Sequence, residues 1–196
     1  MLLKPAQAKS ADINLIVTHL RAGEVVILPT DTIYGLSCLA LDKRAVKRVF
    51  QIKKREANKP LINLVSSLAM AKGCAYISRQ TEKNLRHYWQ ESNRPTTVIL
   101  PAREKFPSGV VAADNSISLR LPKSEFLIKI IRKVKSPLVS TSLNLSGQAP
   151  LLDLKNLPTF FPKNSQPSLV VDSGPCRRRP SRLIDLREEK VKVIRK

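Results

Sequence analysis

Glycine, cysteine and histidine are scarce in this sequence, and each shortage argues against a class of site. The 196 residues include six glycines, three cysteines and two histidines. The glycines form neither the P-loop pattern nor the dinucleotide-binding pattern, both of which bring backbone N–H groups to phosphates. Cys38, Cys74 and Cys176 lie far apart with no histidine beside them, so we expect no zinc site and no disulfide framework. A phosphate-binding site would therefore depend on side-chain cations and scattered backbone N–H groups.

Long apolar runs are missing as well. No run approaches the roughly 20 residues that span a membrane, and the first residues lack the apolar stretch of a signal peptide. We therefore expect a cytoplasmic protein that does not associate with a membrane. With 42% hydrophobic and 26% charged residues the chain has a globular composition. Its length predicts a single domain over residues 1–196 that folds without a disulfide or a metal.

Acidic residues are few compared with basic ones. The chain has 35 Lys and Arg against 15 Asp and Glu, a formal charge of +20. Such an excess attracts polyanions and predicts salt-sensitive binding. A basic proteome or a solubility function would explain the same charge, and the charge alone does not distinguish tRNA, DNA, ATP and a membrane surface. Residues 177–196 form a basic C-terminal segment, for which a solvated tail and a phosphate-binding role both remain open.

Hydrophobic periodicity predicts helices that alternate with short buried strands. Apolar residues at helical spacing predict helices near 11–21, 45–52, 82–88 and 126–134. Aliphatic runs predict strands near 25–28, 61–65, 97–100, 117–121, 138–139 and 169–171. This alternation is typical of an α/β protein built around one sheet.

Three polar segments follow these predicted elements. They are PTDTIYGL (29–36), KKR (53–55) with KPL (59–61), and STSLNLSG (140–147). Open α/β sheets bind ligands where strands end, and an arginine with a lysine suits a phosphoryl group. Each segment alone also has a structural explanation: a turn capped by Asp31 beside a packed Tyr34, cations at a helix C-terminus, and an Asx or Ser/Thr turn. Their joint occurrence in this order is the specific signal.

In this order the segments resemble those of the YrdC/TsaC threonylcarbamoyl-AMP synthases. The family motif P-T-[DE]-T-x-[YF]-G-[LV] matches residues 29–36, K-x-R matches Lys53 and Arg55, and S-x-N matches Ser142 and Asn144. Segments 95–99, 118–122 and 180–185 are similar to the family's P-x-T, R-[VL]-P and P-S-x-[IV]-x-D elements. The resemblance is to the short, single-domain form and runs from about residue 12 to 186.

The sequence departs from the family pattern at three places. Glu56 stands where a proline often follows K-x-R, Leu143 replaces the usual alanine of T-S-A-N, and the W-P-G-P stretch is reduced to Trp89 with residues 92–95. No charged member of the expected site is lost, so these departures concern loop shape more than activity.

The resemblance implies a twisted mixed sheet flanked by helices and a defined reaction. L-Threonine, bicarbonate and ATP would give threonylcarbamoyl-AMP and pyrophosphate, for the threonylcarbamoyladenosine modification of tRNA. Mg²⁺ would arrive with ATP, without a dedicated protein metal site. The site residues would be Lys53 and Arg55 as catalytic ATP-phosphate contacts, Ser142 and Asn144 on the nucleotide, Lys59 and Ser181 as further ATP contacts, Thr32 on threonine, and Arg120 on the threonine carboxylate or the triphosphate.

Two other interpretations remain open from the sequence. A non-catalytic RNA-binding module of the same fold would use the +20 charge without an ordered ATP and threonine site. A divergent relative could act on another carboxylate substrate. As partners of the enzyme we expect tRNA-modifying proteins, with direct tRNA binding left open. We expect a monomer or a weak dimer.

Overall fold

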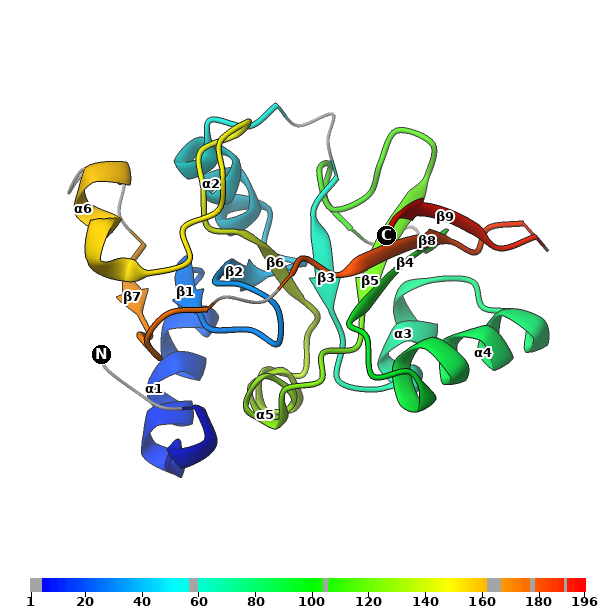
Figure 1. Ribbon diagram of the computed structural model, residues 1–196, viewed down its shortest axis with the longest axis horizontal. Helices are drawn as coiled ribbons and strands as arrows, with labels where there is room; N and C mark the ends of the chain where they lie inside the picture. The colour runs from blue at the N-terminus through cyan, green and yellow to red at the C-terminus, as the bar shows by residue number, and fades with distance from the viewer. Residues whose placement is uncertain (1–4, 57–59, 104–105, 162–166, 177–178, 189) are drawn as a thin grey trace.

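The structure, a computed structural model, describes residues 5–56, 60–103, 106–161, 167–176, 179–188 and 190–196 (Figure 1). Its strands are β1 (Val26–Leu28), β2 (Gly35–Leu39), β3 (Ile62–Leu64), β4 (Thr96–Pro101), β5 (Ser116–Arg120), β6 (Leu138–Ser142), β7 (Leu169–Val170), β8 (Arg182–Asp185) and β9 (Lys192–Arg195). In the described part of the chain they form one nine-stranded sheet in the order β7-β1-β2-β6-β3-β5-β4-β8-β9.

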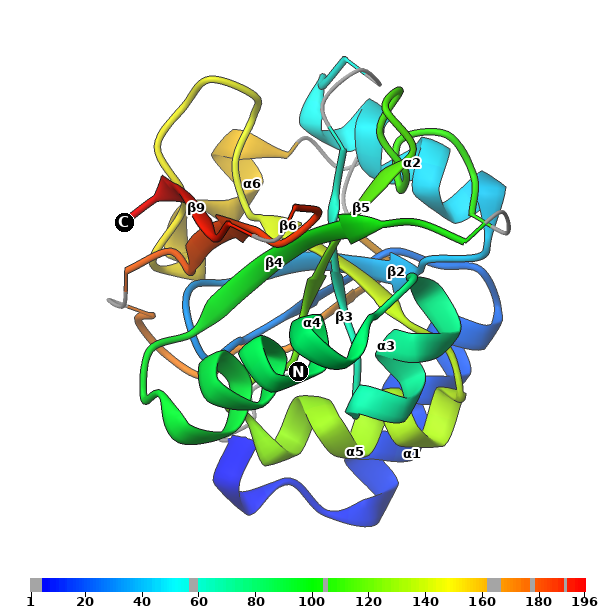
Figure 2. The ribbon, with the colours of Figure 1, turned by 90° about the vertical axis from the view of Figure 1, so that its right-hand side faces the viewer.

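The sheet is mixed and twisted. β1 pairs with β7, β3 with β5 and β4 with β8 in parallel, whereas the remaining neighbours are antiparallel. In the view of Figure 2, β3 and β4 run in clearly different directions although only β5 separates them. Such a turn between close neighbours is the ordinary right-handed twist of strands added up along the sheet. The predicted fold class, an α/β twisted mixed sheet flanked by helices, is confirmed.

The α-helices are α1 (Ser10–Arg21), α2 (Lys43–Lys53), α3 (Leu68–Cys74), α4 (Arg79–Arg86), α5 (Glu125–Val134) and α6 (Leu157–Phe160). Side-chain oxygens accept first-turn N–H groups and so begin four of them: Asp42 for α2, Ser67 for α3, Ser78 for α4 and Ser124 for α5. Short 3₁₀ turns cover Pro5–Gln7 and Leu154–Asn156, and a π turn covers His87–Glu91. No helix among the described residues is long and apolar enough to cross a membrane.

Two apolar clusters hold the helices on opposite faces of the sheet. Val26 and Leu28 pack with α1 and α5, while Ile27 between them packs in the cluster that contains the apolar faces of α2 and α3. This alternation follows from the two-residue period of a strand. Burial stabilises each large apolar side chain by roughly 1.5–3 kcal/mol relative to full exposure. α5 alone buries six such side chains, Phe126, Leu127, Ile128, Ile130, Ile131 and Val134.

The sheet face that α5 covers is apolar at one end of its strands and polar at the other. Leu64 and Leu138 lie under α1 and α5. On the same face, Ser140 and Ser142 follow Leu138 along β6. Arg120 is the residue of β5 that pairs with Leu64. The polar ends of these strands line a pocket instead of carrying a helix.

The structure adds elements that the periodicity did not predict. β2 is buried but contains Gly35 and Ser37, so it has no aliphatic run of the kind that marked the predicted strands. The four residues of β9 are all exposed. β8 and β9 pair with each other at the edge of the sheet, so residues 182–185 and 192–195 of the basic C-terminal segment are strands.

Candidate active site

A pocket of about 470 Å³ collects residues from widely separated segments of the chain. This volume is in the usual range for small-molecule sites, about 300–1,000 Å³. Six of the eight residues implied by the family resemblance line it: Thr32, Arg55, Arg120, Ser142, Asn144 and Ser181. Of the other two, Lys53 lies fully buried at the end of α2, and Lys59 falls outside the described residues.

Gly35 keeps the floor of this pocket open. It pairs with Ser142 at the start of β2 and lines the pocket. A Cβ at this position would lie 2.4 Å from the Ser140 hydroxyl and 3.3 Å from a Thr30 methyl group. Any side chain here would therefore push into the pocket wall, which explains the glycine of the PTDTIYGL segment.

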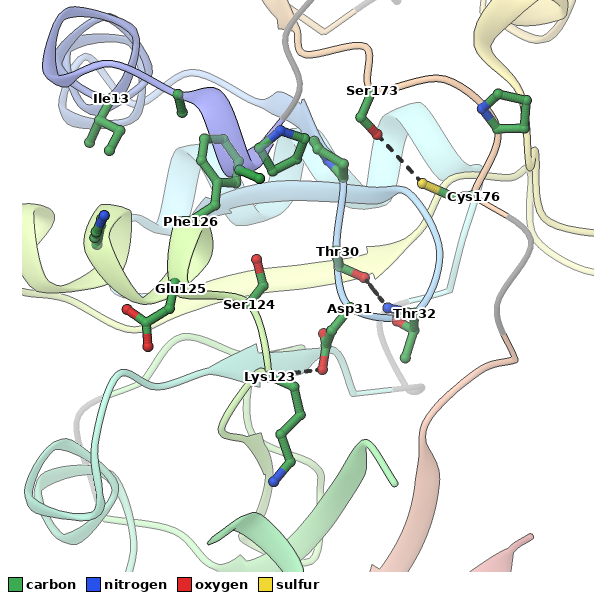
Figure 3. Close-up of a pocket in the computed structure, with 16 residues that line it drawn as sticks. Ile13, Thr30, Asp31, Thr32, Lys123, Ser124, Glu125, Phe126, Ser173 and Cys176 are labelled. Atoms are coloured by element: carbon green, nitrogen blue, oxygen red, sulfur yellow. Dashed lines mark hydrogen bonds between the residues drawn. The ribbon is translucent and has the colours of Figure 1, made fainter. Parts of the chain in front are cut away.

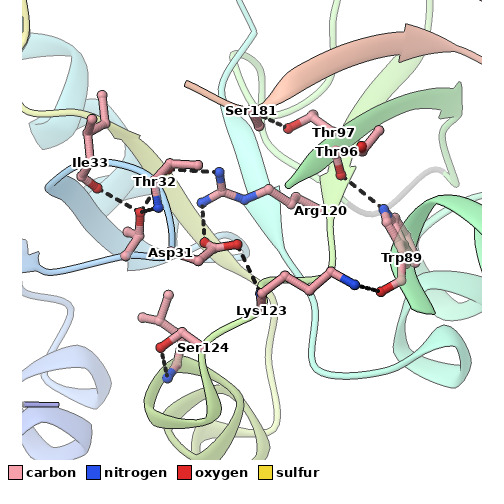
Figure 4. A network of polar contacts seen from close by, with 12 residues as sticks. Asp31, Thr32, Ile33, Trp89, Thr96, Thr97, Arg120, Lys123, Ser124 and Ser181 are labelled. Atoms are coloured by element: carbon pink, nitrogen blue, oxygen red, sulfur yellow. Dashed lines mark hydrogen bonds and ion pairs between the residues drawn. The ribbon is translucent and has the colours of Figure 1, made fainter. Parts of the chain in front are cut away.

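Arg120 is a buried cation that lines the pocket, and its guanidinium points toward Asp31 and Thr32 (Figure 4). Only 4% of the residue is exposed. One terminal nitrogen lies 3.3 Å from an Asp31 carboxylate oxygen, and the other donates a hydrogen bond of 3.0 Å to the Thr32 hydroxyl. Its Nε has no hydrogen-bond partner among the described residues. Burial lowers the pKa of Arg120 from its usual value, the Asp31 carboxylate opposes that shift, and Arg195 adds to it.

The turn that presents Thr32 is held by its own hydroxyls and by α5. The Thr30 hydroxyl accepts the Thr32 N–H at 3.0 Å and donates to the Ile33 carbonyl at 2.7 Å. The Asp31 carboxylate accepts the Lys123 N–H at 2.9 Å, just before α5 begins. Asp31 thus ties the turn to the α5 entry and to Arg120, which is more than the local turn cap expected from the sequence.

Lys53 binds the loop that carries the S-x-N residues. Its ammonium donates to the Ser142 carbonyl, to the Asn144 carbonyl at 3.0 Å and to the Asn144 side-chain oxygen at 2.7 Å. The residue is 0% exposed. Burial, and after it the charge of Arg55, lower the pKa of Lys53 to about 7. The phosphate contact implied by the resemblance stays a prediction.

Arg55 and Arg195 contribute cations from distant parts of the chain. Lys54 adopts a left-handed conformation (φ 48°) that ends α2. Arg55 follows it, lines the pocket and donates to the Pro60 carbonyl at 3.2 Å. Arg195 of β9 also lines the pocket and donates to the Ser181 carbonyl at 2.8 and 3.1 Å. Burial lowers the pKa of both arginines.

Arg195 is the site residue that sequence reasoning missed. The basic character of residues 177–196 was visible, but nothing in the letters marked one arginine among many. Its place depends on β8, which pairs with β4 and sets Ser181 beside Thr97, with 2.8 Å between the two hydroxyl oxygens. β9 then folds back on β8 and brings Arg195 to Ser181.

A second pocket of about 600 Å³ lies on the other side of the Thr30–Thr32 turn (Figure 3). Its walls come from the N-terminal 3₁₀ turn, the start of α5 and the segment around Ser173 and Cys176. It is the larger of the two, but Thr32 is the only residue implied by the resemblance that it shares among the described residues. The smaller pocket, where those residues converge, is therefore the candidate active site.

The candidate site suits positioning and electrostatic stabilisation of an anionic ligand. Three arginines, Arg55, Arg120 and Arg195, face it together with the hydroxyls of Thr32, Ser142 and Ser181. Among the described residues that line it there is no cysteine or histidine to act as a nucleophile or a base. The described residues also hold no group of three or more His, Cys, Asp and Glu side chains that could bind a metal. Electrostatic stabilisation by preorganised cations is usually the largest contribution that a site of this kind makes to a reaction of anionic groups.

Comparison with known proteins gives a family for this architecture. The family model Sua5/YciO/YrdC, described as telomere recombination, matches residues 18–196. A threonylcarbamoyl-AMP synthase of Dichelobacter nodosus is 30% identical over 181 residues, which are 92% of this chain and 93% of that protein.

Two further likenesses come from Pyrococcus abyssi. A threonylcarbamoyl-AMP synthase of this organism is 33% identical over 137 residues, 69% of this chain but only 39% of the relative. The solved structure of P. abyssi Sua5 complexed with L-threonine superposes with a TM-score of 0.88 and 26% identity. That match covers 100% of this chain and 56% of the Sua5 chain. This chain thus spans about half of the archaeal protein and nearly all of the bacterial one.

Proposed function

The chain belongs to the Sua5/YciO/YrdC family, and from that membership we propose that it converts L-threonine, bicarbonate and ATP into threonylcarbamoyl-AMP and pyrophosphate. The observation that carries the proposal is the convergence of three arginines with Thr32, Ser142, Asn144 and Ser181 in one pocket of about 470 Å³. The relatives named threonylcarbamoyl-AMP synthase support it, the D. nodosus protein over nearly its whole length.

Arg120 and Thr32 form the threonine end of the proposed site. The Arg120 Nε is a buried donor without a partner among the described residues, and leaving such a donor unpaired costs about 1–3 kcal/mol, so a ligand acceptor is the natural partner. A carboxylate fits because arginine binds it as a fork. The Thr32 hydroxyl, which already accepts from Arg120, is placed beside that carboxylate. The L-threonine complex of P. abyssi Sua5 supports an amino acid in this fold.

Arg55, Arg195 and the 142–144 loop form the ATP end. The two arginines take the triphosphate, and Ser181 is fixed between Arg195 and Thr97 as a further contact. The Ser142 hydroxyl donates to the Asn144 side-chain oxygen at 2.6 Å, so the pair presents a fixed set of polar atoms to the nucleotide. Lys59 stays a predicted ATP contact. Mg²⁺ enters bound to the phosphates of ATP, held by phosphate oxygens and water.

The proposed reaction joins two anions, and the site residues offset their repulsion and hold them in line. Bicarbonate loses water to give carbon dioxide, which the threonine amine takes up with loss of a proton to form a carbamate. A carbamate oxygen then attacks the α-phosphorus of ATP while the bond to pyrophosphate breaks. Arg55 and Arg195 neutralise the charge that develops on the phosphoryl oxygens. Arg120 and Thr32 hold the carbamate in line with the α-phosphate, which removes the entropy of bringing two substrates together. The product supplies tRNA-modifying proteins in the cytoplasm, where ATP and tRNA are found.

Pyrophosphate release tests this function directly. We expect release from ATP and Mg²⁺ only when both L-threonine and bicarbonate are present. L-Valine has a methyl group where threonine has its hydroxyl, and we expect it to support little release because the polar group of the site that pairs with the threonine hydroxyl is then left without a partner. Release that is independent of the amino acid would contradict the proposal, and so would equal release with valine and threonine.

A second candidate function, RNA binding, is favoured by the exposed face of α2. Lys43, Arg44, Lys47 and Arg48 are all exposed on this helix, and its sequence contains no acid. α2 ends two residues before Arg55, which lines the pocket, so these cations lie on the helix whose C-terminal end is next to the pocket. α5 and the residue that follows it, Lys135, carry four exposed cations as well. The basic end of α5 is followed by the start of β6, whereas the pocket lies at the other end of that strand.

This difference allows a matched pair of variants. One variant replaces Lys43, Arg44, Lys47 and Arg48 by glutamine, and the other replaces Lys129, Arg132, Lys133 and Lys135, so both lose four charges. If α2 binds RNA, only the first variant lowers the slope of log K against log salt for a tRNA transcript, by about 0.7–0.9 for each lost phosphate contact. Fluorescence anisotropy over a salt series measures the slope. An equal decrease of this slope in both variants would show that RNA binding depends on the net charge of the protein and not on the α2 surface.

A further inference from the structure

The ammonium of Lys53 has no hydrogen left for a ligand. A lysine ammonium has three donors. All three are used, by the carbonyls of Ser142 and Asn144 and by the side-chain oxygen of Asn144. The residue is 0% exposed. A direct contact with a phosphate would therefore require that one of these bonds break and that the ammonium move out through the loop.

The backbone of Lys53 holds the same loop from a second side. Its carbonyl accepts the Ser146 N–H at 2.9 Å. Leu143, between the two S-x-N residues, donates its N–H to the Tyr34 carbonyl at 3.1 Å. The loop is thus fixed to the end of α2 and to the start of β2, and the Lys53 side chain supplies the bonds nearest the pocket wall.

These contacts also set the orientation of the Asn144 amide. Its oxygen accepts from Lys53 at 2.7 Å and from the Ser142 hydroxyl at 2.6 Å, which uses both lone pairs. Its nitrogen donates one N–H to the Gln148 carbonyl at 2.7 Å. Asn144 lines the pocket, so the second N–H of this amide is what it can offer a ligand. Without Lys53, the amide could turn over and present its oxygen, which would repel a phosphate.

We propose that Lys53 is a positioning residue, which fixes the 142–146 loop and the amide of Asn144 so that the pocket presents a donor to ATP, and that it does not itself contact the phosphates. The inference rests on the proposed function only for the identity of the ligand. It differs from the direct phosphate contact that the family resemblance implies for Lys53.

A double-mutant cycle on ATP affinity separates positioning from direct contact. Lys53→Met and Asn144→Ala are each expected to weaken ATP binding roughly 10–100-fold, the effect of one hydrogen bond to a charged group. If Lys53 acts through Asn144, the double variant binds ATP within about twofold of Asn144→Ala alone, because the amide that Lys53 positions is already absent. Effects that multiply would overturn the proposal. The control pair is Arg195→Gln with Asn144→Ala, whose effects are expected to multiply because Arg195 contacts Ser181 and the ligand.

The pH dependence of ATP affinity gives a readout that a purely structural role would not move. The charged group that faces Lys53 from its own segment is Arg55, while from β6 and its loop the neutral Ser142 and Asn144 approach it. As pH rises through the lowered pKa of about 7, the amine loses a proton and can no longer serve three acceptors. We expect the ATP affinity of the wild type to fall over this range relative to that of Lys53→Met, in which the ionisation of ATP itself still contributes but that of Lys53 does not. In Arg55→Gln the fall moves to higher pH, because the charge of Arg55 lowers the pKa of Lys53.

A measurement on the wild type covers the case in which a variant does not fold. The Lys53 ammonium should give a ¹⁵N signal whose hydrogens exchange slowly with water, since the group is buried and fully bonded. Addition of inorganic pyrophosphate is expected to leave this signal unchanged, and a large shift would overturn the proposal. None of these experiments needs threonine or bicarbonate. Failure of threonine-dependent pyrophosphate release would therefore reject the proposed function without deciding the role of Lys53.

Discussion

Replacement of Arg120 by methionine is expected to lower threonine-dependent pyrophosphate release by a factor on the order of 10²–10³, the usual loss when a preorganised charge is removed. The same change should also destabilise the protein. Asp31 is only 4% exposed, and its carboxylate would lose the ion pair with Arg120 at 3.3 Å. Removing one partner of a buried ion pair costs about 3–5 kcal/mol, because the other charge stays buried and loses its counter-ion.

The double variant Asp31→Asn with Arg120→Met separates the two effects. It removes both charges at once, and such replacements are often neutral for stability. We therefore expect the free energy of unfolding to return close to the wild-type value while activity stays lost. Urea unfolding measures the first quantity and pyrophosphate release the second. Recovery of activity in the double variant would show that Arg120 serves the fold and not the substrate.

Arg55→Gln and Arg195→Gln are each expected to lower kcat/KM for ATP by a factor on the order of 10²–10³ with little change in stability. Arg55 is half-buried, Arg195 is exposed, and both donate to backbone carbonyls, so their removal leaves no buried charge behind. Each would lose a cation that offsets the charge of the transition state. Steady-state pyrophosphate release with varied ATP measures the effect, and thermal unfolding checks the fold.

Arg187→Gln is the matched control for these two variants. Arg187 follows β8 and forms exposed ion pairs with Asp185 and Asp114, away from the pocket-lining residues. The change removes the same charge, and exposed ion pairs contribute only about 0–1 kcal/mol. Activity is therefore expected to stay near the wild-type value. If Arg187→Gln weakened catalysis as much as Arg195→Gln, the net charge of the protein and not a specific contact would be responsible.

Much of the candidate site could be predicted from the sequence because its residues sit in short local patterns. Thr32 follows a β-branched strand in a turn rich in hydroxyls, and Ser142 and Asn144 follow another strand in the same way. The structure brings these segments to one pocket, as expected from the rule that ligands bind where strands end. Arg195 could not be predicted in this way, since one arginine in a basic segment carries no local signal.

The sequence by itself determined the α/β class, most helices and strands, and the chemical character of the site, because apolar periodicity and motif spacing are local properties. Only the tertiary structure decided which cations line the pocket. Lys53 and Arg55 are two residues apart, yet the left-handed Lys54 leaves the first buried under the 142–146 loop and the second in the pocket. Arg195 joins them through the pairing of β8 with β4 and of β9 with β8. Such long-range pairings depend on how strands from distant parts of the chain share one sheet, and residue letters within a short window do not encode that arrangement.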